Sequence, residues 1–124
     1  MALGESRENY LKSILILTKA KGSVRAVDLS HFMGLSKASV SIAVGRLRGE
    51  GYVAVGEEGA LGLTEAGRAE AEAVYERYCF FAQKLTDLGV PVEQAHLDAC
   101  RLEHAISEES FAAIRRASEY AFGG

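Results

Sequence analysis

The stretch LSHFMGLSKASVSIAVGRLRGEGYVAV, residues 29–55, decides the fold of this chain. It reads as two short helices around a tight turn, followed by a strand. Gly34 can adopt the left-handed backbone conformation that closes the first helix. Ser36 is the expected N-cap of the second helix, because its hydroxyl can accept a hydrogen bond from an exposed backbone N–H. The pattern predicts a helix-turn-helix motif.

The second helix of this motif has two chemically different faces. Val40, Val44 and Leu47 lie at i, i+4 and i+7, which predicts an apolar face turned toward a core. Small hydroxyls and cations occupy the opposite side: Lys37, Ser39, Ser41, Arg46 and Arg48. This mix suits a helix that lies in a DNA major groove against phosphates and base edges. The alternative is an amphipathic helix with a purely structural role, which usually carries Glu and Lys on its outer face.

Double-stranded DNA is therefore the predicted partner. The predicted DNA contacts are Ser36, Lys37, Ser39, Ser41 and Arg46, with Arg48 and Lys12 at phosphates. Charge supports this, since residues 1–56 hold eight Lys or Arg against four Asp or Glu, whereas residues 57–124 hold six against thirteen. Because the cationic excess is small, one copy would bind phosphates weakly, and a dimer would double the contacts.

The flanking segments predict a winged helix over residues 1–63. A helix is expected over residues 6–20, with Ser6 near its cap and a broad apolar stripe facing the core. The core is also expected to receive Val24, Val27 and Phe32. Residues 52–55 and 60–63 flank a Gly-Glu-Glu-Gly turn and read as a short β-hairpin, the wing.

The second domain is predicted to span residues 64–124 and to be helical. Thr64 is the expected N-cap of a long helix over residues 65–88, followed by helices over 92–106 and 108–120. The predicted fold class is therefore mostly α. No apolar stretch reaches the roughly 20 residues that a membrane helix needs, and no signal peptide is recognisable. With only two cysteines, the chain is expected to be a cytoplasmic protein rather than a disulfide scaffold.

The predicted helix over residues 92–106 carries a second group of functional side chains. His96, Cys100, Glu103 and His104 are spaced i, i+4, i+7 and i+8, so a helix places them on one stripe. Thiolate, carboxylate and imidazole together suit Fe(II), Co(II), Ni(II) or Zn(II) better than Mg²⁺ or Ca²⁺. In the alternative interpretation Cys100 is a small core side chain and its neighbours are solvated.

These residues resemble a known family. The sequence ACRLEHAIS at residues 99–107, after His96, closely resembles the metal-site helix of the diphtheria toxin repressor family of iron- and manganese-dependent regulators. The first helix, the turn motif, the wing and the long helix follow in the family's order. The resemblance covers nearly all of the chain and implies the two-domain form, without the SH3-like domain of some members.

The resemblance implies a homodimeric, metal-responsive repressor that binds DNA when metal is plentiful. Cys100, Glu103 and His104 match ligands of the family's primary metal site, His96 matches a ligand of the ancillary site, and Asn9 falls at the first-helix ligand position. A cysteine at this place favours an iron-type response over a manganese-type one. Fe(II) is thus the expected cofactor, with Mn(II), Co(II), Ni(II) or Zn(II) as the other candidates.

Several family ligand positions are occupied by other residue types. Asn9 stands where the family has Met or Asp, Lys12 replaces an acid of manganese sensors, and Tyr78 and Ala82 replace ancillary-site His and Glu. The alternative is therefore a winged-helix regulator of this fold that has lost metal control and needs no cofactor, or responds to a small molecule. A metalloenzyme is not expected, because no motif supplies a placed acid or base beside an open metal position.

Overall fold

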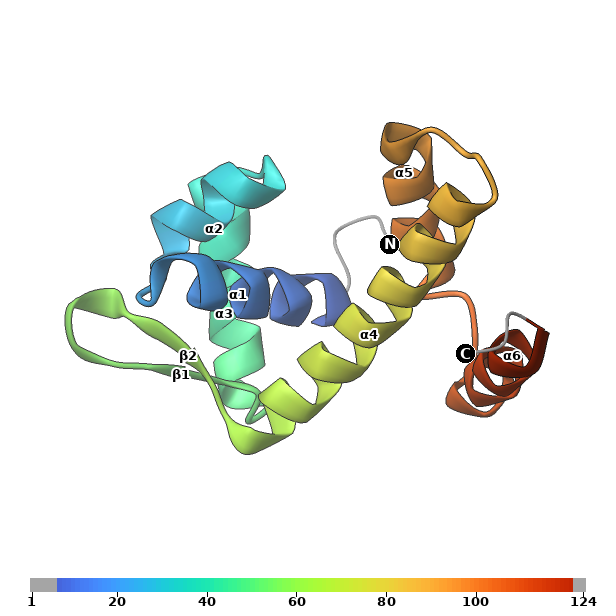
Figure 1. Cartoon of the computed structure of the whole chain (residues 1–124). Coiled ribbons are helices and arrows are strands. Elements are labelled where there is room, and N and C mark those ends of the chain that lie inside the picture. The colour runs from blue at the N-terminus through green and yellow to red at the C-terminus, as the bar shows by residue number, and fades with distance from the viewer. Residues whose placement is uncertain (1–6, 122–124) are drawn as a thin grey trace. The chain divides into compact units, whose positions relative to one another are not determined.

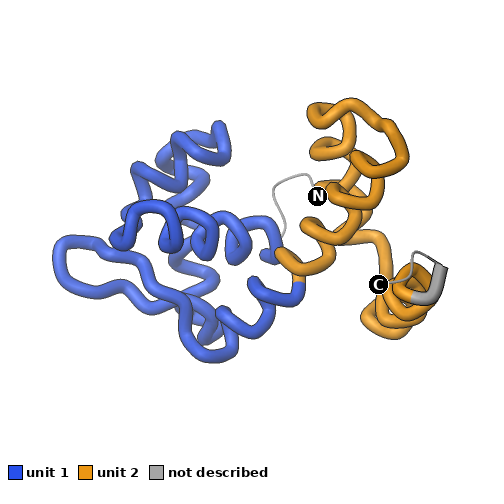
Figure 2. The backbone as a smooth tube through the Cα atoms, viewed as in Figure 1, with its two compact units in different colours: residues 1–73 blue, residues 74–124 orange. Residues whose placement is uncertain are grey.

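The computed structural model of the chain describes residues 7–121, so the expected cap at Ser6 lies outside the described residues. The chain divides into two compact units, residues 1–73 and residues 74–124 (Figure 2). The long helix α4, Glu65–Asp87, contributes residues to both. Among the described helices, none is long and apolar enough to cross a membrane.

Unit 1 is built on three helices: α1 (Arg7–Lys21), α2 (Ala26–Met33) and α3 (Lys37–Gly49) (Figure 1). Their shared core consists of apolar side chains that are almost fully buried: Leu11, Ile14, Leu15, Val24, Leu29 and Val40. Gly34 closes α2 in the left-handed conformation, with φ of 69°. Ser36 caps α3, since its Oγ accepts a hydrogen bond from the backbone N–H of Ser39 at 3.1 Å. Both terminal residues act as predicted.

The predicted wing is present in unit 1. Strands β1 (Val53–Val55) and β2 (Leu61–Leu63) pair antiparallel, with Val53 opposite Leu63, around the short 3-10 turn η1 (Glu57–Gly59). The backbone N–H of Leu61 also donates to the carbonyl of Val24 at 2.7 Å. Because Val24 is fully buried, this bridge fixes the hairpin to the helical core.

The first turn of α4 packs directly on the base of the wing. The hydroxyl of Thr64 donates to the carbonyl of Gly51 at 2.7 Å and accepts from the backbone N–H of Gly67 at 3.1 Å, the predicted N-cap. A Cβ atom at Gly67 would lie 2.1 Å from the carbonyl oxygen of Tyr52. Only glycine therefore permits this approach of helix to strand.

Unit 2 consists of the remainder of α4 with α5 (Val92–Leu102) and α6 (Glu108–Ala121). An aromatic cluster joins α4 to α6, because the ring of Phe111 lies 5.3 Å from that of Phe80 and 5.9 Å from that of Phe81, centroid to centroid. On α5 the buried residues are the small Ala95 and Ala99.

The predicted extent of α5 was wrong. The helix ends at Leu102 instead of continuing to residue 106, so Glu103 is its C-cap and His104 follows it in a turn. A tertiary contact favours this end, since Nε of the buried Arg77 on α4 donates to the carbonyl of Glu103 at 2.8 Å. That carbonyl would otherwise lack an intrahelical partner.

Three side chains of unit 1 are placed differently from the prediction. Val27 and Phe32 are 36% and 49% exposed, because the short helix α2 fills its core position with Leu29. Lys12 is only 7% exposed, since α1 buries every residue from Tyr10 to Leu15. Lys12 is thus poorly placed for the predicted phosphate contact.

Candidate nucleic-acid interface and metal centre

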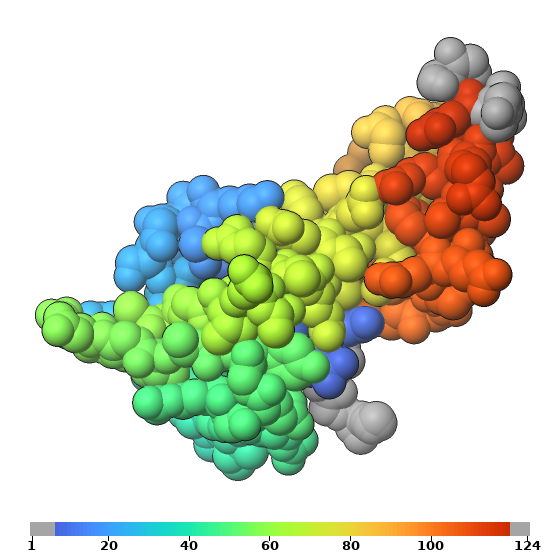
Figure 3. All heavy atoms as spheres, turned by 90° about the horizontal axis from the view of Figure 1, so that it is seen from below, coloured from blue at the N-terminus to red at the C-terminus, as the bar shows by residue number. Residues whose placement is uncertain are grey.

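Helix α3 has the two faces that its sequence predicts. Val40, Val44 and Leu47 are at most 8% exposed. The predicted DNA contacts at the cap and on the outer face of α3 are all exposed: Ser36, Lys37, Ser39, Ser41, Arg46 and Arg48. The blue-green atoms of α3 form part of the surface of unit 1 in Figure 3. Helix α3 thus holds hydrogen-bonding and cationic groups toward solvent on the side opposite its buried face.

The start of α3 is organised by its own hydroxyls. Besides capping the helix, Ser36 Oγ lies 3.0 Å from Ser39 Oγ, so the two hydroxyls are hydrogen-bonded to each other. Each hydroxyl also retains lone-pair capacity for an external donor. The predicted DNA contacts at Ser36 and Ser39 therefore begin from a fixed geometry.

One prominent residue of this surface was missed by the sequence analysis. Ile42 is 67% exposed in the middle of α3. Two residues, about 200° of helix rotation, separate it from the buried Val40. Its position outside the i, i+4, i+7 stripe was the signal in the sequence, because a large apolar residue there has no place in the core.

In unit 2 the structure brings together two predicted metal-site residues, His96 and Cys100, and Tyr78, which stands where the family has a ligand. The Sγ atom of Cys100 lies 3.8 Å from Nε2 of His96, one turn earlier on α5. The hydroxyl of Tyr78 on α4 lies 2.6 Å from Nδ1 of the same imidazole, with the two rings edge to face at 5.4 Å. His96 is therefore engaged through both ring nitrogens.

The hydroxyl of Tyr78 can act as the donor to His96. A tyrosine hydroxyl is protonated at neutral pH, and burial, and next the nearby Cys100, raise the pKa of Tyr78 further, so this hydroxyl can donate to Nδ1 of His96. In that tautomer the remaining ring proton is on Nε2 and points toward the Cys100 sulfur. Tyr78 thus orients His96 toward Cys100.

Glu103 and His104 form a second pair just beyond α5. Glu103 is fully buried, and its Oε1 lies 3.9 Å from Nε2 of the more exposed His104. Within residues 7–121, no three side chains of His, Cys, Asp or Glu converge in an arrangement ready to hold a metal ion. Asn9 lies half-buried on α1 of unit 1, and its part in metal binding remains a prediction. The donor types fit a transition metal, but within the described residues no three of them converge on one point.

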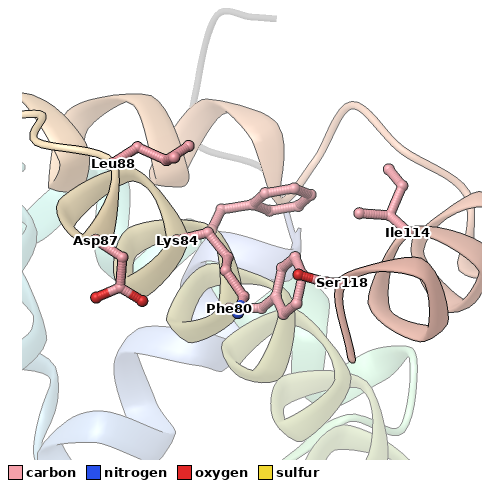
Figure 4. Close-up of a pocket in the computed structure, with 7 residues that line it drawn as sticks. Phe80, Lys84, Asp87, Leu88, Ile114 and Ser118 are labelled. Carbon is pink, nitrogen blue, oxygen red and sulfur yellow. The ribbon is translucent and has the colours of Figure 1, made fainter. Parts of the chain in front are cut away.

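Unit 2 also contains a cavity of about 410 Å³ between α4 and α6 (Figure 4). Its walls are mostly apolar, with Lys84, Asp87 and Ser118 at the edge; the other lining residues are Phe80, Phe81, Leu88 and Ile114. This composition is unsuited to metal binding and typical of a surface that receives apolar side chains.

Two sequence models of one family match the chain in succession. The iron dependent repressor N-terminal DNA binding domain matches residues 2–61, and the iron dependent repressor metal binding and dimerisation domain matches residues 64–121. Among curated relatives, the iron-dependent repressor IdeR of Mycobacterium tuberculosis is 33% identical over 108 residues, 86% of this chain and 47% of that protein. The diphtheria toxin repressor of Corynebacterium diphtheriae is 31% identical over 108 residues, 86% of this chain and 48% of that protein. The chain thus spans about half the length of these relatives.

Solved structures show the same fold. A manganese-dependent transcriptional repressor in complex with manganese is 29% identical, with a TM-score of 0.80 over 90% of this chain and 52% of that one. IdeR of T. acidophilum superposes with a TM-score of 0.79 over 98% of this chain and 55% of the other, at 24% identity. The mostly helical fold with a winged helix is confirmed. The chain belongs to the iron-dependent repressor family, that of the diphtheria toxin repressor, whose members are metal-dependent transcriptional repressors and not enzymes.

Proposed function

We propose that this chain is a sequence-specific repressor that binds double-stranded DNA as a homodimer under the control of a divalent metal. One observation carries the proposal: α3 buries one apolar face and exposes hydroxyls and cations on the other, within a segment that matches the family's DNA-binding domain. We place the boundary between a DNA-binding domain and a dimerisation and metal-binding domain at residues 63 and 64, at the start of α4. Such a repressor acts in the cytoplasm.

The DNA contacts come from α3. Ser36, Lys37, Ser39, Ser41 and Arg46 read and position the duplex, and the exposed Arg48 binds phosphate. Arg and Lys supply most of the affinity through phosphates, whereas side chains in the groove supply sequence preference. Support comes from the exposure of all six side chains and from the cap that fixes the start of the helix.

The metal ligands are Cys100, Glu103 and His104, joined by a weak ligand or water at Asn9 and by His96 as ligand or neighbour. The bound ion would supply positive charge that draws these separate donors together. A thiolate ligand favours Fe(II) over Mn(II), since manganese prefers harder oxygen ligands. Neighbours of this fold include both iron- and manganese-dependent proteins, so the preference for iron depends on Cys100.

The second copy binds through unit 2. This unit exposes large apolar side chains that a solitary domain would be expected to bury: Leu88, Val92, Leu97, Leu102 and Ile114. The first two are 71% and 69% exposed. Its sequence also matches a domain described as metal binding and dimerisation.

One specific observation favours a second candidate, a regulator of this fold without metal control. Tyr78 already holds Nδ1 of His96, and no described group of three donors converges. In this candidate the hydrogen-bonded Tyr78–His96–Cys100 group stabilises unit 2 in place of an ion, and DNA binding requires no cofactor.

Anaerobic calorimetric titration of reduced, metal-free protein with Fe(II), Mn(II), Co(II) and Zn(II) separates the two candidates. We expect micromolar or tighter binding that Cys100→Ser abolishes or weakens by at least about 100-fold, more than removal of an outer-sphere group achieves. Arg116→Ala, an exposed change on α6, serves as the control and should bind as the parent does. If the parent binds none of the four ions, the metal-dependent proposal is wrong and the metal-independent one stands.

A further inference from the structure

The exposed side chain of Ile42 lies at the centre of the outer face of α3. Its 67% exposure is the highest among the large apolar side chains described in unit 1. On a helix its neighbours at i−3 and i+4 are Ser39 and Arg46, both exposed and both among the proposed DNA contacts. An apolar group is thus set between a hydroxyl and a cation.

The residues on the other side of Ile42 are small. Ala38 and Gly45 lie at i−4 and i+3 and are exposed. A Cβ atom added at Gly45 would meet nothing within 4 Å, so packing inside the protein does not require a glycine. Glycine in a helix interior lowers helix stability relative to alanine. Its presence there leaves the backbone open to a close approach from outside, with Ile42 projecting beside it.

The chemistry of a DNA major groove identifies the partner of such a side chain. Base edges there present hydrogen-bond donors and acceptors, and the C5-methyl group of thymine is their apolar feature. We propose that Ile42 contacts a thymine methyl and makes the operator require thymine beneath the middle of α3. The proposal rests on the proposed DNA binding and adds a residue that determines specificity. A 5-methylcytosine would present the same methyl group.

The test removes the methyl group of thymine and shortens the side chain of Ile42 in turn. Duplexes are first enriched from a random-sequence pool by the full chain, in separate selections with Co(II) and with a chelator. Each thymine of the enriched site is then replaced by deoxyuridine, which lacks only the C5-methyl. We expect binding to weaken about fourfold for each contacted thymine, from the transfer free energy of one buried methyl group.

The variants Ile42→Ala and Ile42→Val supply the matching changes on the protein, each tested against the thymine and the deoxyuridine duplex. Ile42→Ala should bind the thymine duplex more weakly and bind thymine and deoxyuridine duplexes equally, whereas Ile42→Val should keep part of the discrimination. Unchanged thermal unfolding is the control for folding, since Ile42 lies mostly in solvent. Replacing the contacted thymine pair by 5-methylcytosine and guanine tests whether the methyl alone suffices or thymine's other groups are also read.

Two results would overturn the inference while leaving DNA binding intact. The first is equal affinity of the parent for thymine and deoxyuridine duplexes. The second is full thymine discrimination by Ile42→Ala, which would assign the methyl contact to another residue. A pool from which neither selection enriches any sequence would instead contradict the proposed function itself, and the contact with it.

Discussion

The two candidate sites of this molecule differ in how their side chains are held. The proposed DNA contacts lie on α3, a thirteen-residue helix with a hydroxyl cap at its start and a buried apolar face along its length. The proposed primary metal ligands lie where α5 ends: Cys100 is in the helix, Glu103 caps it, and His104 is in the following turn. The proposed DNA-contact face of α3 is already formed, whereas among the described residues no three metal donors converge.

This difference indicates where a metal can act. A helix fixed by its cap and core changes little when a ligand arrives, whereas the exposed residues from His104 onward, beyond the Arg77–Glu103 hydrogen bond, can rearrange more readily. A metal that gathers Cys100, Glu103 and His104 would therefore shift the conformational ensemble of unit 2 while leaving α3 as it is. Repression would then depend on where α3 is positioned against DNA. The structure of α3 itself would not change.

The largest effect is expected from a substitution that disrupts the packing of α4 on the base of the wing in unit 1. Gly67→Ala should destabilise the protein by about 3 kcal/mol or more, because its Cβ would lie 2.1 Å from the carbonyl oxygen of Tyr52. Chemical denaturation measures the free energy of unfolding. Gly45→Ala is the matched control: its Cβ meets nothing within 4 Å, so it should stabilise α3 by about 0.5–1 kcal/mol. Equal effects of the two changes would contradict the close packing of α4 on the wing.

The next effect concerns the cations of α3. Lys37→Ala with Arg46→Ala should weaken DNA binding and reduce the magnitude of its slope against log salt by about 0.9 for each phosphate that the protein no longer neutralises. Binding isotherms over a range of salt concentrations measure this slope. Arg116→Ala removes an exposed cation of unit 2 and should leave the slope unchanged. Retention of the parent affinity by the double variant would refute the proposed docking of α3.

A smaller effect is expected on the hydrogen-exchange rates of the two sites, which one experiment can compare. Hydrogen–deuterium exchange with and without Co(II) should show slower exchange at residues 103–106, because ligation of Glu103 and His104 would order this turn. The backbone amides of α3 should exchange at the same rate in both states, since its hydrogen bonds are already formed. Protection confined to α3 would reverse the account of which site is preformed.

The smallest effect is expected at the start of α2. Hydrogen bonding from Lys21, at 2.6 Å, and next from the backbone N–H of Arg25 lowers the pKa of Asp28. A lowered folded pKa adds stability above the unfolded value of 3.8, and this stability disappears as pH falls through the folded value. Asp28→Asn should therefore melt slightly below the parent at neutral pH, and the difference should vanish in strong acid. A difference that persists there would assign the effect to packing instead of charge.

The winged helix was predictable because its signals are local. Gly34 and Ser36 mark the two helix ends around the turn, and the stripe of Val40, Val44 and Leu47 fixes which face of α3 is buried. Each of these features depends on residues within one or two turns of one another. The same locality made the exposed set on α3 predictable, although the significance of Ile42 became clear only from its exposure.

The end of α5 was not predictable because it depends on a residue far away in the sequence. No Gly or Pro lies within residues 103–107 to stop the helix, and the apolar pattern continues to Ile106. The helix ends where the side chain of Arg77 hydrogen-bonds to the carbonyl of Glu103, 26 residues later. The Tyr78–His96 hydrogen bond is a similar case, since 18 residues separate the partners. Contacts between helices decide both features.

Metal-dependent DNA binding tests the central claim most directly. The enriched duplex, labelled with a fluorophore, is titrated anaerobically with reduced protein in Fe(II), in Mn(II) and in a chelator, for the parent and for Cys100→Ser. We predict tight binding by the parent in Fe(II), weaker binding in Mn(II), and little binding in chelator or by the variant in any condition. Equal affinity of parent and variant in Fe(II) and in chelator would contradict metal control and leave a metal-independent DNA-binding protein.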